Sequence, residues 1–243
     1  MRSIVYVICL LAGSMTSFAF AGSAVTGATV TVTNLDLVHN SATLETVNNS
    51  RKDITAYSVA VVATYANGRE DRSEKMLDYG SKLTARGAVL HPGSVAEQQA
   101  AWGVLDEKPL VRVDAKVVAV VYADHTAETS DDEALGRIQS HRSSVALALT
   151  KSAELLQRSL ADINEPNPRA RASEDIKKLL SSDPFAHGIE PVYLKGISDE
   201  LDEAPQAAAK LGVSEREYLS QRLARLQREA AQESRYAQIG RAQ

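Results

Sequence analysis

The stretch ITAYSVAVVATYANGRE, residues 54–70, decides the fold of the first half of the chain. It alternates between large and small side chains, and the large ones fall on odd positions: Tyr57, Val59, Val61 and Tyr65. This period of two, with one bulky face, predicts a strand that lies on a hydrophobic core. Asn67-Gly68 then predicts a tight hairpin, because these residues accept the positive φ angles that such turns require.

A second segment repeats this pattern, since VVATYANG (residues 61–68) is matched by VAVVYADH (residues 118–125). Asp124-His125 is therefore predicted to form a turn in the same role, because Asp and His tolerate the left-handed region better than most residues. Apolar residues occupy both registers from Val118 to Tyr122. Either a bulge switches the face there, or this half of the strand is buried on both sides.

Other short strands are predicted at residues 29–37 and 42–47, with turns at residues 48–53 and 91–93. The segment EKMLDYGSKL, residues 74–83, is open between a short helix and an irregular loop. Short strands separated by turns over about a hundred residues are typical of a β-sandwich.

The period of the sequence changes at Ser130. Ser130 and Glu133 match a capping box, and Asp131 and Asp132 suit the positive end of a helix dipole. Apolar residues then recur at steps of three, four or seven, and predict one long amphipathic helix to about Ile163. They are Leu135, Ile138, Val145, Leu149, Ala153, Leu156, Leu160 and Ile163, and Arg142 stands where one more would fall.

The segment NEPNPRA is expected to end this helix. Shorter helices are predicted at residues 173–182 and 203–212, with a loop or minor strand at residues 183–196. Ser214 and Glu217 match a second capping box, which opens a last helix with an apolar seam. Residues 164–243 are expected to be helical and in part mobile, because they hold little apolar area beyond the seams.

The stripe of the long helix must pack on something, because a helix of this kind draws its stability from its buried face. The last helix, folded back antiparallel, is the favoured partner, since its seam has the same spacing. Pairing with a second chain in a coiled coil is the alternative, in which Arg142 sets the register with an acidic partner.

The N-terminus predicts export. Arg2 is followed by the apolar run IVYVICLLA, residues 4–12, and by the cleavage pattern Ala19-Phe20-Ala21. The apolar run is too short to span a bilayer. We therefore expect a signal peptide, residues 1–21, cleaved after Ala21, and a secreted or periplasmic protein without a membrane span.

The only cysteine, Cys9, lies within the predicted signal peptide, so the mature chain is expected to form no disulfide. Ser14 stands where a lipid-modified cysteine would be needed, so no lipid anchor is expected. The full chain has a net charge of -4, which argues against a general nucleic-acid binder.

No motif for nucleophilic catalysis, phosphate binding, dinucleotide binding or metal binding appears in the sequence. The five histidines, His39, His91, His125, His141 and His187, do not share helical metal spacing. The acidic run at residues 124–133 lacks the glycine spacing of a calcium loop and suits a hairpin followed by a helix start. Asn48-Asn49-Ser50 is a glycosylation sequon on a predicted turn. We expect no catalytic residue, no cofactor and no metal site.

The last helix carries a line of arginines, Arg222, Arg225 and Arg228, beside its apolar seam. Such a line either grips an acidic partner or forms an ion-paired face with the interleaved glutamates. The candidate partner-binding residues are Leu219, Leu223, Leu226, Arg222 and Arg225.

The segments VNNSRKDITAYSVAVVATYANGRE (residues 47–70) and VDAKVVAVVYADHTAE (residues 113–128) resemble immunoglobulin-like or fibronectin-like modules of exported bacterial proteins. In such modules an apolar run ending in Tyr and an Asp/Asn-Gly turn marks paired strands. The usual Gly is His125 in the second segment. The resemblance implies a fold for about 105 residues and carries no functional residue with it.

These observations predict an α+β protein with a β-sandwich at residues 22–129, a long helix at residues 130–163 and a helical C-terminal region at residues 164–243. The expected function is a non-enzymatic interaction module of the cell envelope, whose arm binds a protein partner or a second copy. The alternatives are an envelope hydrolase with a site at the junction of sandwich and arm, and a glycan-binding module that uses Trp102 and a few tyrosines.

Overall fold

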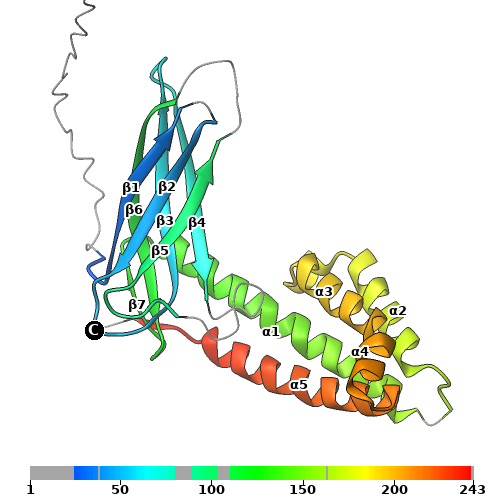
Figure 1. Ribbon diagram of the computed structural model, residues 1–243. Helices are drawn as coiled ribbons and strands as arrows, with labels where there is room; N and C mark the ends of the chain where they lie inside the picture. The colour runs from blue at the N-terminus through cyan, green and yellow to red at the C-terminus, as the bar shows by residue number, and fades with distance from the viewer. Residues whose placement is uncertain (1–24, 38, 80–88, 103–109, 163, 242–243) are drawn as a thin grey trace, which may run out of the picture.

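A computed structural model describes residues 25–37, 39–79, 89–102, 110–162 and 164–241. The fold is α+β, with two antiparallel sheets followed by helices (Figure 1). We call strands β1–β7 the sheet region and helices α1–α5 the helical arm. Figure 1 shows the arm extending sideways from the lower end of the sheet region. The predicted signal peptide lies outside the described residues.

One sheet has three strands in the order β1-β2-β5, and the other has the order β4-β3-β6-β7-β8. Neighbouring strands are antiparallel except β7 and β8, which pair in parallel. The first sheet consists of β1 (Ala28–Asp36), β2 (Ser41–Asn48) and β5 (Val95–Ala101). The second consists of β3 (Ile54–Tyr65), β4 (Glu70–Asp78), β6 (Leu110–Tyr122), β7 (Thr126–Thr129) and β8 (Gly240–Arg241).

The large face of β3 lies in the core, as the alternation predicts. Tyr57, Val59, Val61 and Tyr65 are buried in one hydrophobic cluster. The same cluster contains Leu44 from β2 and other side chains of the three-stranded sheet. The two sheets therefore share a core that needs no residue of the arm.

The second half of β6 shows both features that its sequence allows, a bulge and burial on both faces. The pairing with β3 skips from Ala119 opposite Ser58 to Val117 opposite Val59, which leaves Val118 as a bulge. Every residue from Val117 to Tyr122 is also buried. Both faces are covered because the first turns of α1 lie on the outer side of this sheet, where Leu135 and Ile138 join one cluster with Val118 and Val121.

The two hairpin turns share one geometry, with a positive φ only at the second turn residue. His125 has a φ of 65° and Asp124 has no positive φ, so the predicted turn at Asp124-His125 forms with its second residue alone in the left-handed region. At the β3–β4 turn only Gly68 has a positive φ, of 81°, and the expectation that Asn67 also has one is wrong. The Asn67 side chain instead accepts a hydrogen bond from the Arg69 N–H at 3.2 Å, which holds the turn without a left-handed Asn.

The sequence pattern does not predict the second half of β4 or strand β5. Residues 74–78 belong to β4, so neither a short helix nor an irregular loop forms there, while residues 80–83 of that segment lie outside the described residues. Strand β5 was not predicted, because only Ala100 of its seven residues is fully buried and the alternation is weak.

Helix α1 (Asp132–Ala161) begins one residue later than the capping box suggests. The cap is Asp131, whose carboxylate accepts hydrogen bonds from the N–H groups of Glu133 and Ala134. Ser130 instead continues the sheet, since its N–H donates to the Val118 carbonyl at 2.9 Å. The second predicted box is confirmed in part, because the Ser214 hydroxyl accepts a hydrogen bond from the Glu217 N–H at 3.2 Å.

The remaining helices are more numerous than predicted, and α2 is longer. Helix α2 starts at Pro168 rather than at residue 173, because Pro fits the first helical position and Asn167 caps it. Residues 183–196, which were expected to be a loop or minor strand, contain a 3-10 helix and the first half of α3. The bounds are α2 (Pro168–Ser181), η1 (Pro184–His187), α3 (Pro191–Asp202), α4 (Ala204–Leu211) and α5 (Glu215–Tyr236).

Helix α5 folds back antiparallel along α1, as the shared spacing of the two seams favours (Figure 1). Leu149 and Leu156 of α1 lie in one cluster with Leu219 and Leu226 of α5. At the far end of the pair, the Arg216 guanidinium donates to the Leu160 carbonyl at 2.7 Å. The stripe of the long helix is therefore covered within the chain.

One carboxylate ties the start of β1 to β7. Glu128 accepts hydrogen bonds from the Thr26 N–H at 2.8 Å, the Gly27 N–H at 3.0 Å and the Tyr122 hydroxyl at 2.7 Å. Burial alone would raise the pKa of Glu128, but the hydrogen bonds from Tyr122, Thr26 and Gly27 outweigh it and hold the pKa below the ordinary value. A Cβ on Gly27 would stand 1.7 Å from the Tyr122 hydroxyl oxygen, so this approach requires glycine.

Replacing Glu128 with Gln is expected to lower the free energy of unfolding at pH 7 by about 1 kcal/mol, because charge-assisted hydrogen bonds are lost. A depressed pKa stabilises the fold above the ordinary glutamate range, and this contribution disappears as the pH falls through the folded-state value. The difference between wild type and variant should therefore shrink below about pH 4. Urea unfolding at several pH values measures it, with Glu154→Gln, an exposed carboxylate of α1, as control. A pH-independent difference would contradict this account.

Candidate partner-binding site

The helices α2 and α3 pair side by side, and η1 joins them at one end of the pair. Gly188 ends η1 with a φ of 69°, and Pro191 opens α3 at its first position. The Glu190 N–H, which precedes α3, donates to the buried Ser144 hydroxyl of α1 at 2.6 Å. These contacts fix the η1–α3 connection against the long helix.

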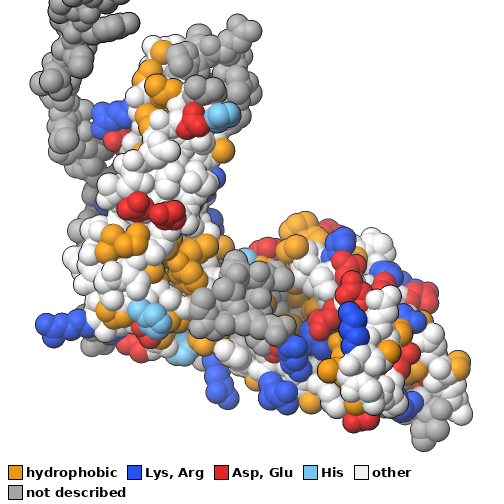
Figure 2. All heavy atoms as spheres, viewed as in Figure 1, with side chains coloured by type: hydrophobic (Ala, Val, Ile, Leu, Met, Phe, Trp, Pro, Cys, Tyr) orange, Lys and Arg blue, Asp and Glu red, His pale blue; other side chains and the backbone are white. Residues whose placement is uncertain are grey.

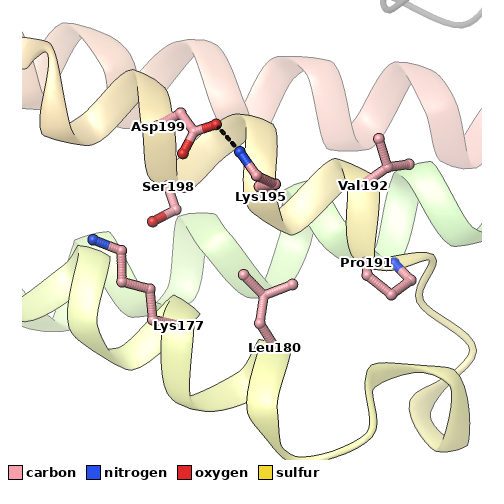
Figure 3. A pocket seen from close by; sticks show the side chains of 7 residues that line it. All are labelled: Lys177, Leu180, Pro191, Val192, Lys195, Ser198 and Asp199. Carbon is pink, nitrogen blue, oxygen red and sulfur yellow. Dashed lines mark hydrogen bonds and ion pairs between the residues drawn. The ribbon is translucent and has the colours of Figure 1, made fainter.

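A groove of about 420 Å³ runs between α2 and α3 (Figure 3). It is open to solvent, and its walls are mostly apolar because its lysines contribute their aliphatic stems. Figure 3 shows Pro191 and Val192 toward one end, Lys177 and Ser198 toward the other, and Leu180 between them. The lining residues are Lys177, Leu180, Pro191, Val192, Lys195, Ser198 and Asp199.

The polar rim of the groove carries both signs of charge. The Lys195 ammonium lies 2.7 Å from the Asp199 carboxylate on the same helix. The Lys177 ammonium lies 2.7 Å from the Asp202 carboxylate across the groove. Hydrogen bonds from Lys177 and Ser173 lower the pKa of Asp202, so this carboxylate stays ionised at neutral pH. The rim therefore has no strong field of one sign.

Large apolar side chains stand exposed around this groove. Val192 is 56% exposed on α3, and Phe185 is 67% exposed on η1. Leu147 of α1 is 40% exposed and lies beside Gly188, within 3.6 Å of the position of a Cβ there. Figure 2 shows hydrophobic side chains at the upper edge of the arm, where α3 begins. We call Leu147, Leu180, Phe185, Pro191 and Val192 the α2–α3 face.

A small polar cluster supports the start of α3 from below. The Tyr193 hydroxyl lies 3.0 Å from both ring nitrogens of His141, and the two rings meet edge to face at 5.6 Å. The His141 ring also lies 3.5 Å from the Glu190 carboxylate. This cluster joins α1 to α3 and explains why Val192, next to Tyr193, points outward.

The predicted partner-binding residues lie away from the α2–α3 face. Leu219 and Leu226 are buried in the arm core, and Leu223 is packed against it. Arg222 is buried and lies 2.6 Å from Glu200 and 3.4 Å from Glu229, while Arg225 lies 2.8 Å from Glu229. These residues hold α5 within the arm, and any role in binding a partner stays a prediction.

Three of the histidines and the acidic run each contact different partners. His39 pairs with Asp36 and His91 with Asp53, while His125 lies against the Tyr236 ring at 5.4 Å. Within the acidic run, hydrogen bonds from Lys52 and Thr126 lower the pKa of Asp124 to about 2. Among the described residues, no group of three or more His, Cys, Asp or Glu side chains is placed to hold a metal ion.

The glycosylation sequon is built into the sheet region. Asn48 is buried, and its amide donates to the carbonyls of Leu90 at 2.7 Å and Lys52 at 2.9 Å. Its oxygen accepts a hydrogen bond from the Ser50 N–H at 2.9 Å. The Asn48 side chain therefore organises the turn after β2 and is not presented to solvent.

The junction of sheets and arm, where the alternative hydrolase site was predicted, brings an Arg and an Asp together. The Arg142 guanidinium lies against the Asp78 carboxylate in two hydrogen bonds of 2.8 and 2.9 Å. It also donates to the Thr55 hydroxyl and to the Tyr236 carbonyl, both at 3.1 Å. The Arg142 side chain is 0% exposed and that of Asp78 is 1% exposed, so this pair is closed to solvent.

Comparison with other proteins adds no family to this picture. No protein-family model, curated protein or solved structure matches the chain. In the described part of the chain, no helix combines the length and the apolar character needed to cross a bilayer.

The sequence does not predict the α2–α3 face. Residues 183–196 read as a loop because Pro184, Gly188, Pro191 and Gly196 interrupt the pattern. A usable signal was present in Phe185 and Val192, two large apolar residues with no place in any predicted seam. Their exposure becomes visible only once α2 and α3 are placed side by side.

Proposed function

We propose that the protein is a non-enzymatic interaction module of the cell envelope. In this proposal an immunoglobulin-like β-sandwich carries a helical arm, and the α2–α3 face of this arm binds a protein partner. Export rests on the predicted signal peptide, residues 1–21. The observation that carries the binding function is the open, apolar groove between α2 and α3, with Val192 and Phe185 exposed beside it.

The strand order supports the immunoglobulin-like part of the proposal. Lettered in chain order, β1, β2 and β5 correspond to strands A, B and E, and β4, β3, β6 and β7 correspond to C′, C, F and G. Immunoglobulin-like folds divide their strands between two sheets in this way. Side chains of both sheets also meet in one cluster.

The contacts at the junction support a rigid arm. Leu135 and Ile138 pack on the sheet, Arg142 binds Asp78, and the Gly240 N–H donates to the His125 carbonyl at 2.9 Å. A rigid arm presents a surface at a fixed distance from the sheets and loses little conformational entropy when it binds.

The proposal is tested by placing a photo-crosslinking amino acid at position 185 in the mature protein, within native envelope extract. We expect a crosslinked protein species from position 185. Matched probes at Leu211 on α4 and Val95 on β5, which are also exposed apolar positions, should give none. Absence of any product from position 185, or equal products from all three positions, would overturn the proposed function.

A further inference from the structure

Strand β6 is paired along its whole length on one side and only at one end on the other. It pairs with β3 throughout, whereas β7 pairs only with residues 119–121. The chain then leaves the sheet, because the Ser130 N–H donates to the Val118 carbonyl at 2.9 Å and α1 begins two residues later. Figure 1 shows β7 confined to the lower end of the sheet region, while β6 continues toward the upper end. In the described part of the chain, no strand pairs with residues 110–117 on this side, and we call them the free edge of β6.

The backbone groups along the free edge point away from the sheet. Strand β3 bonds to β4 through its odd-numbered residues, as the hydrogen bond that closes the β3–β4 turn shows. Its even-numbered residues therefore bond to β6, where they lie opposite Arg112, Asp114 and Lys116. The N–H and C=O groups of Val113 and Ala115 are thus directed to the side that β7 leaves open. A row of such groups is complementary to the backbone of an extended strand.

The hydrophobic core is also incomplete beside the free edge. Strand β1 of the other sheet lies next to β6, and its Val30 and Val32 point inward, since Val32 lies opposite the buried Leu44. Both valines are only partly buried, as is Ala115 of β6. In the middle of the same core Val61 is fully buried. Apolar side chains supplied from outside can therefore extend the core at this place.

The two sides of the five-stranded sheet differ in how they treat an incoming strand. On the edge strand β4, Asp71 and Lys75 occupy the core-side register, opposite buried residues of β3. Charges in that register discourage a further strand from pairing. The free edge of β6 has Val113, Ala115 and Val117 in the same register. It therefore has the chemistry of a pairing surface.

The exposure of the core indicates which kind of strand fits. When two folded sheets join edge to edge, each keeps its inward side chains in its own core, so Val30 and Val32 would gain no cover. A strand that belongs to no other sheet can bond to β6 and also send every second side chain between the two sheets. The partly exposed Val30, Val32 and Ala115 favour this second kind of occupant over the sheet edge of another copy.

We infer that the free edge of β6 binds an extended segment of a partner protein, which takes the place that β7 leaves open. The segment runs antiparallel to β6, as β3 and β7 do. Apolar side chains at alternate positions contact Val30, Val32 and Ala115, and polar side chains between them lie on the outer face with Arg112 and Asp114. This site belongs to the sheet region and not to the α2–α3 face, so the inference goes beyond the proposed function.

The first test titrates the mature protein with a labelled peptide of about eight residues, the length of the free edge, in which valine alternates with threonine. Fluorescence anisotropy should give a dissociation constant below about 100 µM. In the antiparallel pairing the valine N–H groups face β6 and the threonine N–H groups face away. Methylation of the valine nitrogens should therefore weaken binding by about 10-fold or more, and methylation of the threonine nitrogens should leave it within about twofold.

The second test locates the strand by hydrogen exchange, followed by NMR. The N–H groups of Val113 and Ala115 should exchange freely in the protein alone and at least about 10-fold more slowly with the peptide bound. Those of Arg112 and Asp114, which bond to β3, should be protected in both states. Ala115→Pro removes an N–H that faces away from β3, so it should keep the circular dichroism spectrum of the wild type and lose peptide binding.

Absence of peptide binding up to about 1 mM would overturn the inference. So would equal binding of the unmethylated and the valine-methylated peptide, which needs no folded variant to measure. Protection of Val113 and Ala115 without peptide would show that the chain itself covers the edge, or a second copy if the protection grows with protein concentration, and either result overturns the inference. The proposed function is tested separately, because the probe at position 185 reports on the α2–α3 face.

Discussion

Replacing Asp78 with Ala is expected to lower the free energy of unfolding by about 3–5 kcal/mol, because it leaves the Arg142 guanidinium buried without its carboxylate. The two side chains are 1% and 0% exposed, so water cannot replace the lost partner without opening the junction. Chemical denaturation of the mature protein measures the loss. The reverse change, Arg142→Met, strands the Asp78 carboxylate and should cost a similar amount.

The double variant Asp78→Leu with Arg142→Met is the matched control for this prediction. Replacing both members of a buried ion pair with apolar side chains of similar size is often neutral, so most of the stability should return. If either single variant costs less than about 1 kcal/mol, the pair is solvated and the junction is looser than the contacts of Thr55 and Tyr236 with Arg142 imply.

Replacing Leu156 with Asp is expected to unfold the helical arm while the sheet region stays folded. Leu156 is fully buried in the arm core with Leu219 and Leu226, and the change both removes its apolar contacts and buries a charge. The expected cost is more than about 4 kcal/mol. The core shared by the two sheets contains no residue of the arm, so it should survive.

Limited proteolysis with mass spectrometry and the helical circular dichroism signal measure this outcome together. Cleavage should appear within α1–α5 and leave a protected fragment that contains β1–β7. Gln157→Asp places the same carboxylate one residue further along, at an exposed position, and should behave as wild type. Simultaneous loss of sheets and helices in the Leu156 variant would show that the two cores unfold as one unit.

Sequence reasoning succeeded where burial follows a local rule. The alternation in residues 54–65 predicted the buried face of β3, because period-two burial is written within one strand. The Ser214 cap and the seam of α5 were found for the same reason. The α5 fold-back on α1 also follows from matching spacings.

Sequence reasoning failed where structure depends on distant partners. The segment NEPNPRA, which contains Pro168, predicts the end of a helix, whereas Pro168 occupies the first turn of α2. By sequence alone Arg142 stands in the place of an apolar residue of the stripe, and no neighbouring residue indicates its partner Asp78, which is 64 residues away. The α2–α3 groove has no sequence signature at all, since it arises from the packing of two helices whose starts were missed.

The closure of the junction by the last residues of α5 has a consequence for the order of assembly. The sheet core and the first turns of α1 are complete once residue 138 has been made. The Tyr236 carbonyl and the pairing of Gly240 with Thr126 reach the junction only when almost the whole chain is available. Contacts of such long sequence separation form late. We therefore expect the contacts of Tyr236 and Gly240, which fix the end of the arm to the sheets, to form after the sheet core.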